Sequence, residues 1–135
     1  MTVLIGYDGK PDTEAALEYA AKLSISFEEP LYVLTVVTKD QMDPNDMDPS
    51  IQSYMEAASQ KVMMMGADVH TIIEVGKPED VILEVADRFQ CDAIVVGRPQ
   101  RSRFDRMVMG SVSQNLVENS DCPVIIVPTS ESSEQ

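Results

Sequence analysis

The sequence predicts a doubly wound, Rossmann-like α/β domain with a five-stranded parallel sheet and four helices on its two faces. Three observations support this class. Short β-branched runs alternate with segments of helical periodicity, a length of 135 residues suits one domain, and an apolar content of 44% is that of a chain with a buried core. Parallel neighbours need crossover connections, so helices must cover both sheet faces.

Five apolar runs of strand length are bounded by turn signals or polar segments. The predicted strands cover residues 2–7, 31–37, 69–75, 92–97 and 123–128. The first run, TVLIGY, ends at the turn signal Asp8-Gly9. Each of the first four runs leads into a helical segment, which is the repeat that a parallel sheet requires.

Apolar residues at helical spacing follow each of the first four strands. The predicted helices cover residues 11–26, about 49–66, from about 78 through Phe89, and about 111–119. Asp48 and Pro49 suit a helix cap and first helical position. Met63, Met64 and Met65 close the second helix, and we expect them to fill core space.

The charge balance limits the partners of the protein. With 23 acidic and 10 basic residues, the net charge is -13, which argues against a nucleic-acid or anionic-membrane partner because both need broad positive potential. No cationic leader and no apolar stretch of membrane-spanning length occurs, so we expect a cytoplasmic protein. Cys91 and Cys122 are too few for a disulfide framework and are expected to be reduced, partly buried thiols.

Neither a metal site nor a catalytic constellation is visible. The second loop carries four aspartates without the glycine and terminal glutamate of a calcium loop, and we interpret it as a solvated loop. Those aspartates are Asp40, Asp43, Asp46 and Asp48. His70 has no partner at ligand spacing, so a core or strand-face position is expected rather than a catalytic one. We therefore predict no metal, no catalytic residue and no enzyme.

Arginines gather between the fourth strand and the fourth helix. Four of the five arginines stand there, at positions 98, 101, 103 and 106, between Gly97 and Gly110. The pair Gly110-Ser111 opens a helix, whose free N–H groups and positive end can bind a phosphate. Solvated charges that pair with the many acidic residues are the competing interpretation.

From residue 1 to residue 128 the chain resembles the universal stress protein family. The resemblance rests on the Asp8-Gly9 turn, on LTVV at the end of the second strand, on GKPEDVILEVADRFQCDAIVVG, and on GSVSQNLVENSDCPVIIVP. It implies one domain over 1–128, a flexible polar tail over 129–135 and the strand order 3-2-1-4-5. The resemblance also implies a nucleotide site at the carboxyl edge of the sheet.

The family motif in nucleotide-binding members is Gly-x-x-Gly, nine residues, then Gly-Ser or Gly-Thr. Here Gly97, Gly110 and Ser111 keep that spacing, but Gln100 replaces the second glycine, and Lys10 replaces the serine that commonly follows Asp-Gly. A side chain at position 100 restricts the backbone where glycine is permissive. Arginine side chains bind phosphate oxygens as forks, and they could compensate.

By resemblance, Asp8 would meet the adenine or ribose end of a nucleotide, and the Val36 backbone would meet the adenine edge. The remaining expected contacts, to ribose and phosphates, are Gly97, Arg98, Arg101, Gly110, Ser111 and Ser113. ATP, accompanied by Mg²⁺, is the expected ligand. A turn role for Asp8 and a helix-cap role for Ser111 are the competing interpretations.

Two functions remain open. The first is a regulatory stress protein that binds ATP or a related anion with little or no hydrolysis. The second is a dimeric interaction module that binds no nucleotide and contacts an acidic protein partner, which Gln100 and Lys10 favour. In both, we expect a homodimer, because the last strand is apolar on both faces and by resemblance lies at a sheet edge. The residues of that strand are Val124, Ile125, Ile126 and Val127.

Overall fold

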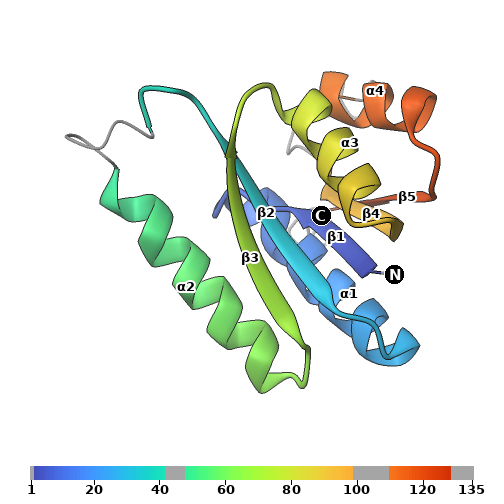
Figure 1. Cartoon of the computed structure of the whole chain (residues 1–135). Helices are drawn as coiled ribbons and strands as arrows, with labels where there is room; N and C mark the ends of the chain where they lie inside the picture. The colour runs from blue at the N-terminus through green and yellow to red at the C-terminus, as the bar shows by residue number, and fades with distance from the viewer. Residues whose placement is uncertain (1, 42–47, 99–109, 129–135) are drawn as a thin grey trace, which may run out of the picture.

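The computed structural model describes residues 2–41, 48–98 and 110–128, in which strands and helices alternate (Figure 1). The strands are β1 (Thr2–Gly6), β2 (Leu31–Val37), β3 (Val69–Val75), β4 (Cys91–Gly97) and β5 (Val124–Val127). The helices are α1 (Pro11–Phe27), α2 (Pro49–Met64), α3 (Pro78–Arg88) and α4 (Ser111–Asn119). The predicted class is confirmed. The expected tail over 129–135 lies outside the described residues.

The sheet is parallel throughout and has the order β3-β2-β1-β4-β5, as predicted. In the centre, Ile5 of β1 lies opposite Val33 of β2 and Val95 of β4. The outer strands are β3 and β5. Because all the strands run in the same direction, their carboxyl ends meet at one edge of the sheet, where β3 leads into α3 in Figure 1.

The core has two layers, one on each face of the sheet. Val3 and Ile5 of β1 are buried in the layer formed with α1 and α2. Leu4, between them, is buried in the layer formed with α3 and α4. Successive side chains of a strand point to opposite faces, so one short strand serves both layers. Each fully buried side chain of this size contributes about 1.5–3 kcal/mol to stability.

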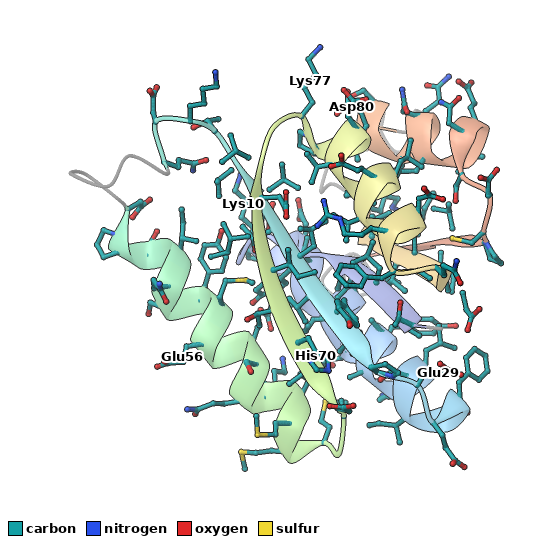
Figure 2. The ribbon with its side chains drawn as sticks, viewed as in Figure 1. Lys10, Glu29, Glu56, His70, Lys77 and Asp80 are labelled. Carbon is teal, nitrogen blue, oxygen red and sulfur yellow. The ribbon has the colours of Figure 1, made fainter. Side chains whose placement is uncertain are left out.

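The helix starts at the carboxyl edge are set by local sequence. Asp48 caps α2 by accepting a hydrogen bond from the Ser50 N–H at 2.9 Å, and Pro49 is the first helical residue, as predicted. Lys10 and Lys77 precede the first prolines of α1 and α3 and are extended, because a residue before proline is disfavoured in the helical region. Figure 2 shows the Lys77 side chain extending away from the molecule at this edge.

The predictions for the cysteines, for His70 and for the methionines of α2 can be compared with the structure. Both cysteines are free, as predicted. His70 is an exposed residue of β3, the strand-face alternative, and its ring stacks on Tyr32 at 5.0 Å between centroids. The core prediction is wrong for Met63 and Met64, which are 58% and 88% exposed because they lie on the outer side of the last turn of α2.

Candidate functional site

A cavity of about 210 Å³ lies across the carboxyl ends of β2, β1 and β4. This is where the strand order reverses around β1, the usual ligand position in doubly wound sheets. Its lining residues come from three strand ends and from the first two turns of α1, α3 and α4. They are Gly6, Tyr7, Asp8, Thr13, Leu34, Val36, Pro78, Ile82, Val96, Gly97 and Val112.

The connection from β1 to α1 is held by its own hydrogen bonds. Asp8 Oδ1 accepts from the Lys10 N–H and from Thr13 Oγ1, both at 2.9 Å. The Thr13 N–H donates to the Lys10 carbonyl at 3.0 Å. Asp8 therefore has the turn role that was its alternative interpretation. These hydrogen bonds reach Oδ1, and the carboxylate is exposed at the cavity rim.

Next to this turn, a series of side-chain hydrogen bonds and ion pairs connects Tyr7, the residue after β1, to α1 and α2. Tyr7 Oη donates to Glu14 of α1, and Lys61 of α2 pairs with Glu14 at 2.9 Å and with Glu18 at 2.8 Å. Burial, reinforced by the Glu14 hydrogen bond, raises the pKa of Tyr7. Burial disfavours the charged form of Glu14, but the hydrogen bonds from Tyr7 and Lys61 outweigh it and lower the Glu14 pKa.

Gly97 forms one wall of the cavity through close backbone packing. A Cβ atom at this position would lie 2.2 Å from the carbonyl oxygen of Asp12 and 3.2 Å from the Cα of Thr13. A contact this short excludes any side chain. Glycine is therefore required here by the approach of the first turn of α1, a reason that the sequence motif did not reveal.

The connection from β4 to α4 is described at its two ends. The Arg98 N–H donates to the Val127 carbonyl at 2.8 Å, which extends the pairing of β4 with β5. Gly110 is buried, is extended and caps α4, and Ser111 is the exposed first residue of that helix. Ser113 is only 3% exposed. Arg101 and Gln100 lie outside the described residues.

The structure brings together three of the predicted contacts, Asp8, Val36 and Gly97. Arg98 and Ser111 are the chain neighbours of lining residues, whereas burial of Ser113 leaves almost none of it accessible. Sequence reasoning missed the residues that line the cavity from the helices. They are Thr13, Pro78, Ile82 and Val112. Their common signal is a place in the first or second turn of a helix that starts at the carboxyl edge.

The chemistry of the cavity combines apolar walls with a polar rim. Leu34, Val36, Ile82 and their neighbours offer aliphatic surface, and Asp8 and Thr13 offer hydrogen-bonding groups. Such a site suits a flat, largely apolar ring with polar edges. Within residues 2–41, 48–98 and 110–128, no three His, Cys, Asp or Glu side chains are grouped to hold a metal ion. Asp43 and Asp46 lie outside those ranges.

No helix in the described part of the chain is both long and apolar enough to cross a membrane.

Comparison with known proteins identifies the family. The universal stress protein family model matches residues 1–128. A universal stress protein of Methanocaldococcus jannaschii is 26% identical, over 93% of this chain and 80% of the relative.

Two solved universal stress proteins share the fold. One, in complex with cAMP, has a TM-score of 0.78 and 26% identity over 96% of this chain and 98% of that chain. The other, from Archaeoglobus fulgidus in complex with dAMP, has a TM-score of 0.74 and 25% identity over 94% and 97%. The chain belongs to the universal stress protein family.

Proposed function

We propose that this universal stress protein binds an adenine nucleotide in the carboxyl-edge cavity and acts as a regulatory protein in the stress response, with little or no hydrolysis. The observation that carries the proposal is the cavity itself, which unites Asp8, Val36 and Gly97 at the switch point of the sheet. The solved relatives in complex with cAMP and with dAMP support the ligand class.

The size of the cavity suggests how a nucleotide would lie. At about 210 Å³ it is smaller than the roughly 300–1,000 Å³ of pockets that enclose whole drug-sized ligands. The apolar walls would therefore hold the base and part of the sugar, and the phosphates would extend towards the start of α4. There, Gly110, Ser111 and the helix end supply N–H groups for an anion.

We assign the phosphate contacts to Arg98, Arg101, Gly110 and Ser111, and the base and sugar contacts to Asp8, Val36 and Gly97. Arginine forks at positions 98 and 101 would supply the positive charge that a triphosphate needs in a chain of net charge -13. Ser113 is a weaker part of the assignment because it is 3% exposed. ATP would arrive with Mg²⁺ on its phosphates.

Low turnover follows from the side chains around the cavity. Asp8 is the one carboxylate among the described lining residues, and its Oδ1 already accepts two hydrogen bonds from the turn. That bonding engages Oδ1 in holding the loop, and no other lining residue in the described part of the chain carries a carboxylate or an imidazole that could activate a water molecule. The proposed role is therefore sensing or sequestering of the nucleotide.

Calorimetric titration with AMP, cAMP and ATP, the last with and without Mg²⁺, tests the proposal. Val112→Phe should fill the cavity and weaken binding at least about tenfold, or about 1.4 kcal/mol. Val117→Phe is the matched control, because it makes the same change on the same helix at a 52% exposed position outside the cavity. No heat with any of these nucleotides at millimolar concentration would contradict the proposal.

We also propose that the protein forms a homodimer through β5. This strand is at the edge of the sheet, and its four apolar side chains are only half-buried. Pairing of two β5 strands across a two-fold axis would cover that edge. Light scattering should give about twice the chain mass of 14.9 kDa. A dimer that binds none of the nucleotides would favour the alternative function, an interaction module for an acidic partner.

A further inference from the structure

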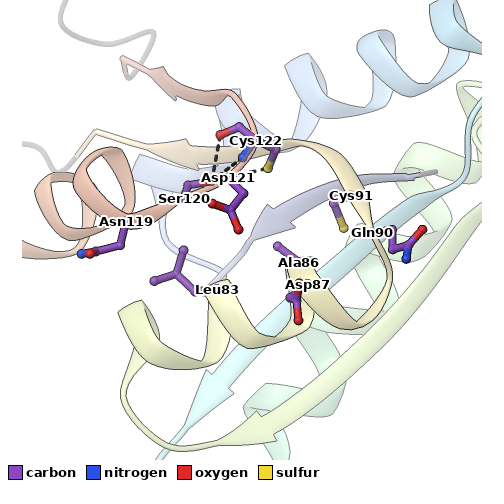
Figure 3. A pocket seen from close by; sticks show the side chains of 9 residues that line it. All are labelled: Leu83, Ala86, Asp87, Gln90, Cys91, Asn119, Ser120, Asp121 and Cys122. Carbon is purple, nitrogen blue, oxygen red and sulfur yellow. Dashed lines mark hydrogen bonds between the residues drawn. The ribbon is translucent and has the colours of Figure 1, made fainter.

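A second cavity, of about 250 Å³, lies at the opposite edge of the sheet from the proposed nucleotide site (Figure 3). It is enclosed by the ends of α3 and α4 and by the segments that start β4 and lead into β5. Its lining residues are Leu83, Ala86, Asp87, Gln90, Cys91, Asn119, Ser120, Asp121 and Cys122. Both cysteines of the chain therefore face one cavity, although they are distant in the sequence.

The sheet brings the segments that carry the two cysteines side by side: Cys91 is the first residue of β4, and Cys122 lies in the bend two residues before β5. Ile94 of β4 lies opposite Val124 of β5, and the Ile94 N–H donates to the Pro123 carbonyl at 2.9 Å. The β4–β5 register therefore brings the segment that precedes β5 beside the start of β4, and residues of both segments line the same cavity.

Both side chains also point into the same layer. Cys91 is part of the buried cluster beneath α3 and α4, and Cys122 packs against that cluster. The register of β1 with β4 shifts between Thr2 and Val3, next to Cys91. This irregularity allows Cys91 to share a face with Ile94, which strict alternation along β4 would not permit. The two thiols thus line one cavity and lie in one core layer, as a cross-link between them requires.

The two thiols differ in their accessibility. Cys91 is 8% exposed, and its Sγ accepts a hydrogen bond from Thr2 Oγ1 at 2.8 Å. Burial raises the pKa of Cys91, against the opposing effect of the Thr2 bond. Cys122 is half-buried and lies in a turn where Ser120 Oγ accepts from its N–H at 3.1 Å. A small solute in the cavity would therefore reach Cys122 first.

We propose that Cys91 and Cys122 are a redox site that forms a reversible intramolecular disulfide when the protein meets a hydroperoxide. This inference is independent of the proposed nucleotide site. Disulfides in otherwise reduced proteins are usually of this transient, sensing kind. The cross-link would close a ring containing β4 and α4, the elements that carry Gly97 and Ser111.

The reaction has two balanced steps. The Cys122 thiolate attacks one peroxide oxygen, the O–O bond breaks, and hydroxide leaves and takes up a proton as water, which yields a sulfenic acid. The Cys91 sulfur then attacks the Cys122 sulfur, the S–O bond breaks, and the departing hydroxide leaves as water with the Cys91 proton. The two thiols lose two electrons in total, and the peroxide gains them. A dithiol reverses the cross-link by exchange.

The test is oxidation of the folded protein with hydrogen peroxide, followed by alkylation and peptide mass mapping without reductant. In the wild type we expect one linked pair of peptides, no alkylated cysteine, and full recovery of both thiols with dithiothreitol. In Cys91→Ser, the reaction should stop at a sulfenic acid on Cys122, which dimedone traps. In Cys122→Ser, Cys91 should be modified at least about tenfold more slowly than Cys122, because it is buried.

Circular dichroism shows whether each variant is folded, and Cys91→Ala is a second choice at the buried position. Oxidation in concentrated urea is the matched control, since it removes the sheet that holds the thiols together. There, the two cysteines should react with peroxide at similar rates. Cysteines that stay alkylatable after oxidation of the folded chain, or a disulfide that joins two chains, would overturn the proposal.

Discussion

The two connections that flank the proposed nucleotide site are built in different ways. The turn from β1 to α1 is held by its own atoms, through the hydrogen bonds of Asp8 Oδ1 with Lys10 and Thr13. The described start of the connection from β4 to α4 is held by other elements. Gly97 packs on the backbone of α1, and the Arg98 N–H bonds β5. One wall of the site is thus held by interactions within its own turn, and the other is held by contacts with elements distant in the sequence.

This difference indicates where substitutions should act. A change in the local turn removes a few hydrogen bonds and leaves the packing of the layers intact. A change at the wall held by distant elements moves α1 away from the sheet and disturbs the core behind it. Stability and ligand binding should therefore be lost together at Gly97, but should be separable at Asp8.

The largest effect is expected for Gly97→Ala. The new Cβ would overlap the Asp12 carbonyl oxygen at 2.2 Å, and backbone cannot yield as a flexible side chain can. We expect a loss of about 3 kcal/mol or more in the free energy of unfolding. Urea denaturation measures it, and nucleotide affinity should fall with it.

Gly6→Ala is the matched control in the same cavity. Its Cβ would lie 3.3 Å from the end of the flexible Ile82 side chain, which can move slightly. The cost should be below about 1 kcal/mol. Equal losses for Gly97→Ala and Gly6→Ala would remove the distinction between the two walls.

An intermediate effect is expected for Asp8→Ala. The change removes an acceptor that orders the turn, so stability should fall by about 1 kcal/mol. The affinity for AMP should fall further than this loss of stability explains, because the carboxylate lies at the cavity rim. Asp8→Asn keeps an oxygen acceptor at Oδ1 and should restore most of the stability. If it also restored full affinity, the negative charge would have no part in binding.

The smallest effect is expected for the interactions of Glu14 with Tyr7 and Lys61, next to the turn from β1 to α1. The Glu14 pKa is lowered in the folded protein, so its contribution is present above its ordinary pKa of 4.5 and is lost as pH falls through the folded value. Lys61→Met removes one cause of that shift. The loss of stability on acidification from about pH 6 to about pH 4 should therefore be smaller in Lys61→Met.

The magnitude should stay below about 1 kcal/mol, because the Lys61–Glu14 pair is partly exposed. Urea midpoints measured across that pH range give the effect. Lys22→Met, at an exposed position of α1, is the control and should follow the wild-type profile. Parallel profiles for Lys61→Met and wild type would show that Tyr7 alone sets the behaviour of Glu14. The raised Lys61 pKa adds a contribution that is lost only as pH rises through its folded value, above 10.5.

Much of the fold could be predicted because its signals are local. The run TVLIGY is apolar at every core position of β1, and the structure buries Val3, Leu4 and Ile5 completely. Asp48 and Pro49 predicted the start of α2, and the structure confirms it. Met63 and Met64 show the limit of composition as a guide, because an apolar side chain at a helix end need not face the core.

The site was predicted in part. Asp8 and Gly97 could be expected beside this cavity because each stands where a strand ends at the carboxyl edge, and such ends converge in a parallel sheet. Val112 and Ile82 were missed, because ordinary apolar residues in a helix carry no local mark of lining a cavity. The proximity of Cys91 to Cys122 was missed as well, since it depends on the register between β4 and β5.

By itself, the sequence determined the alternation of strands and helices and the helix starts, because periodicity and capping are properties of neighbouring residues. Its motifs carried the resemblance to the family. Only the tertiary structure decided which distant atoms meet. The Asp12 carbonyl excludes a side chain at Gly97, and two remote cysteines share one cavity. These contacts depend on how the layers pack and how the strands pair, which no single segment encodes.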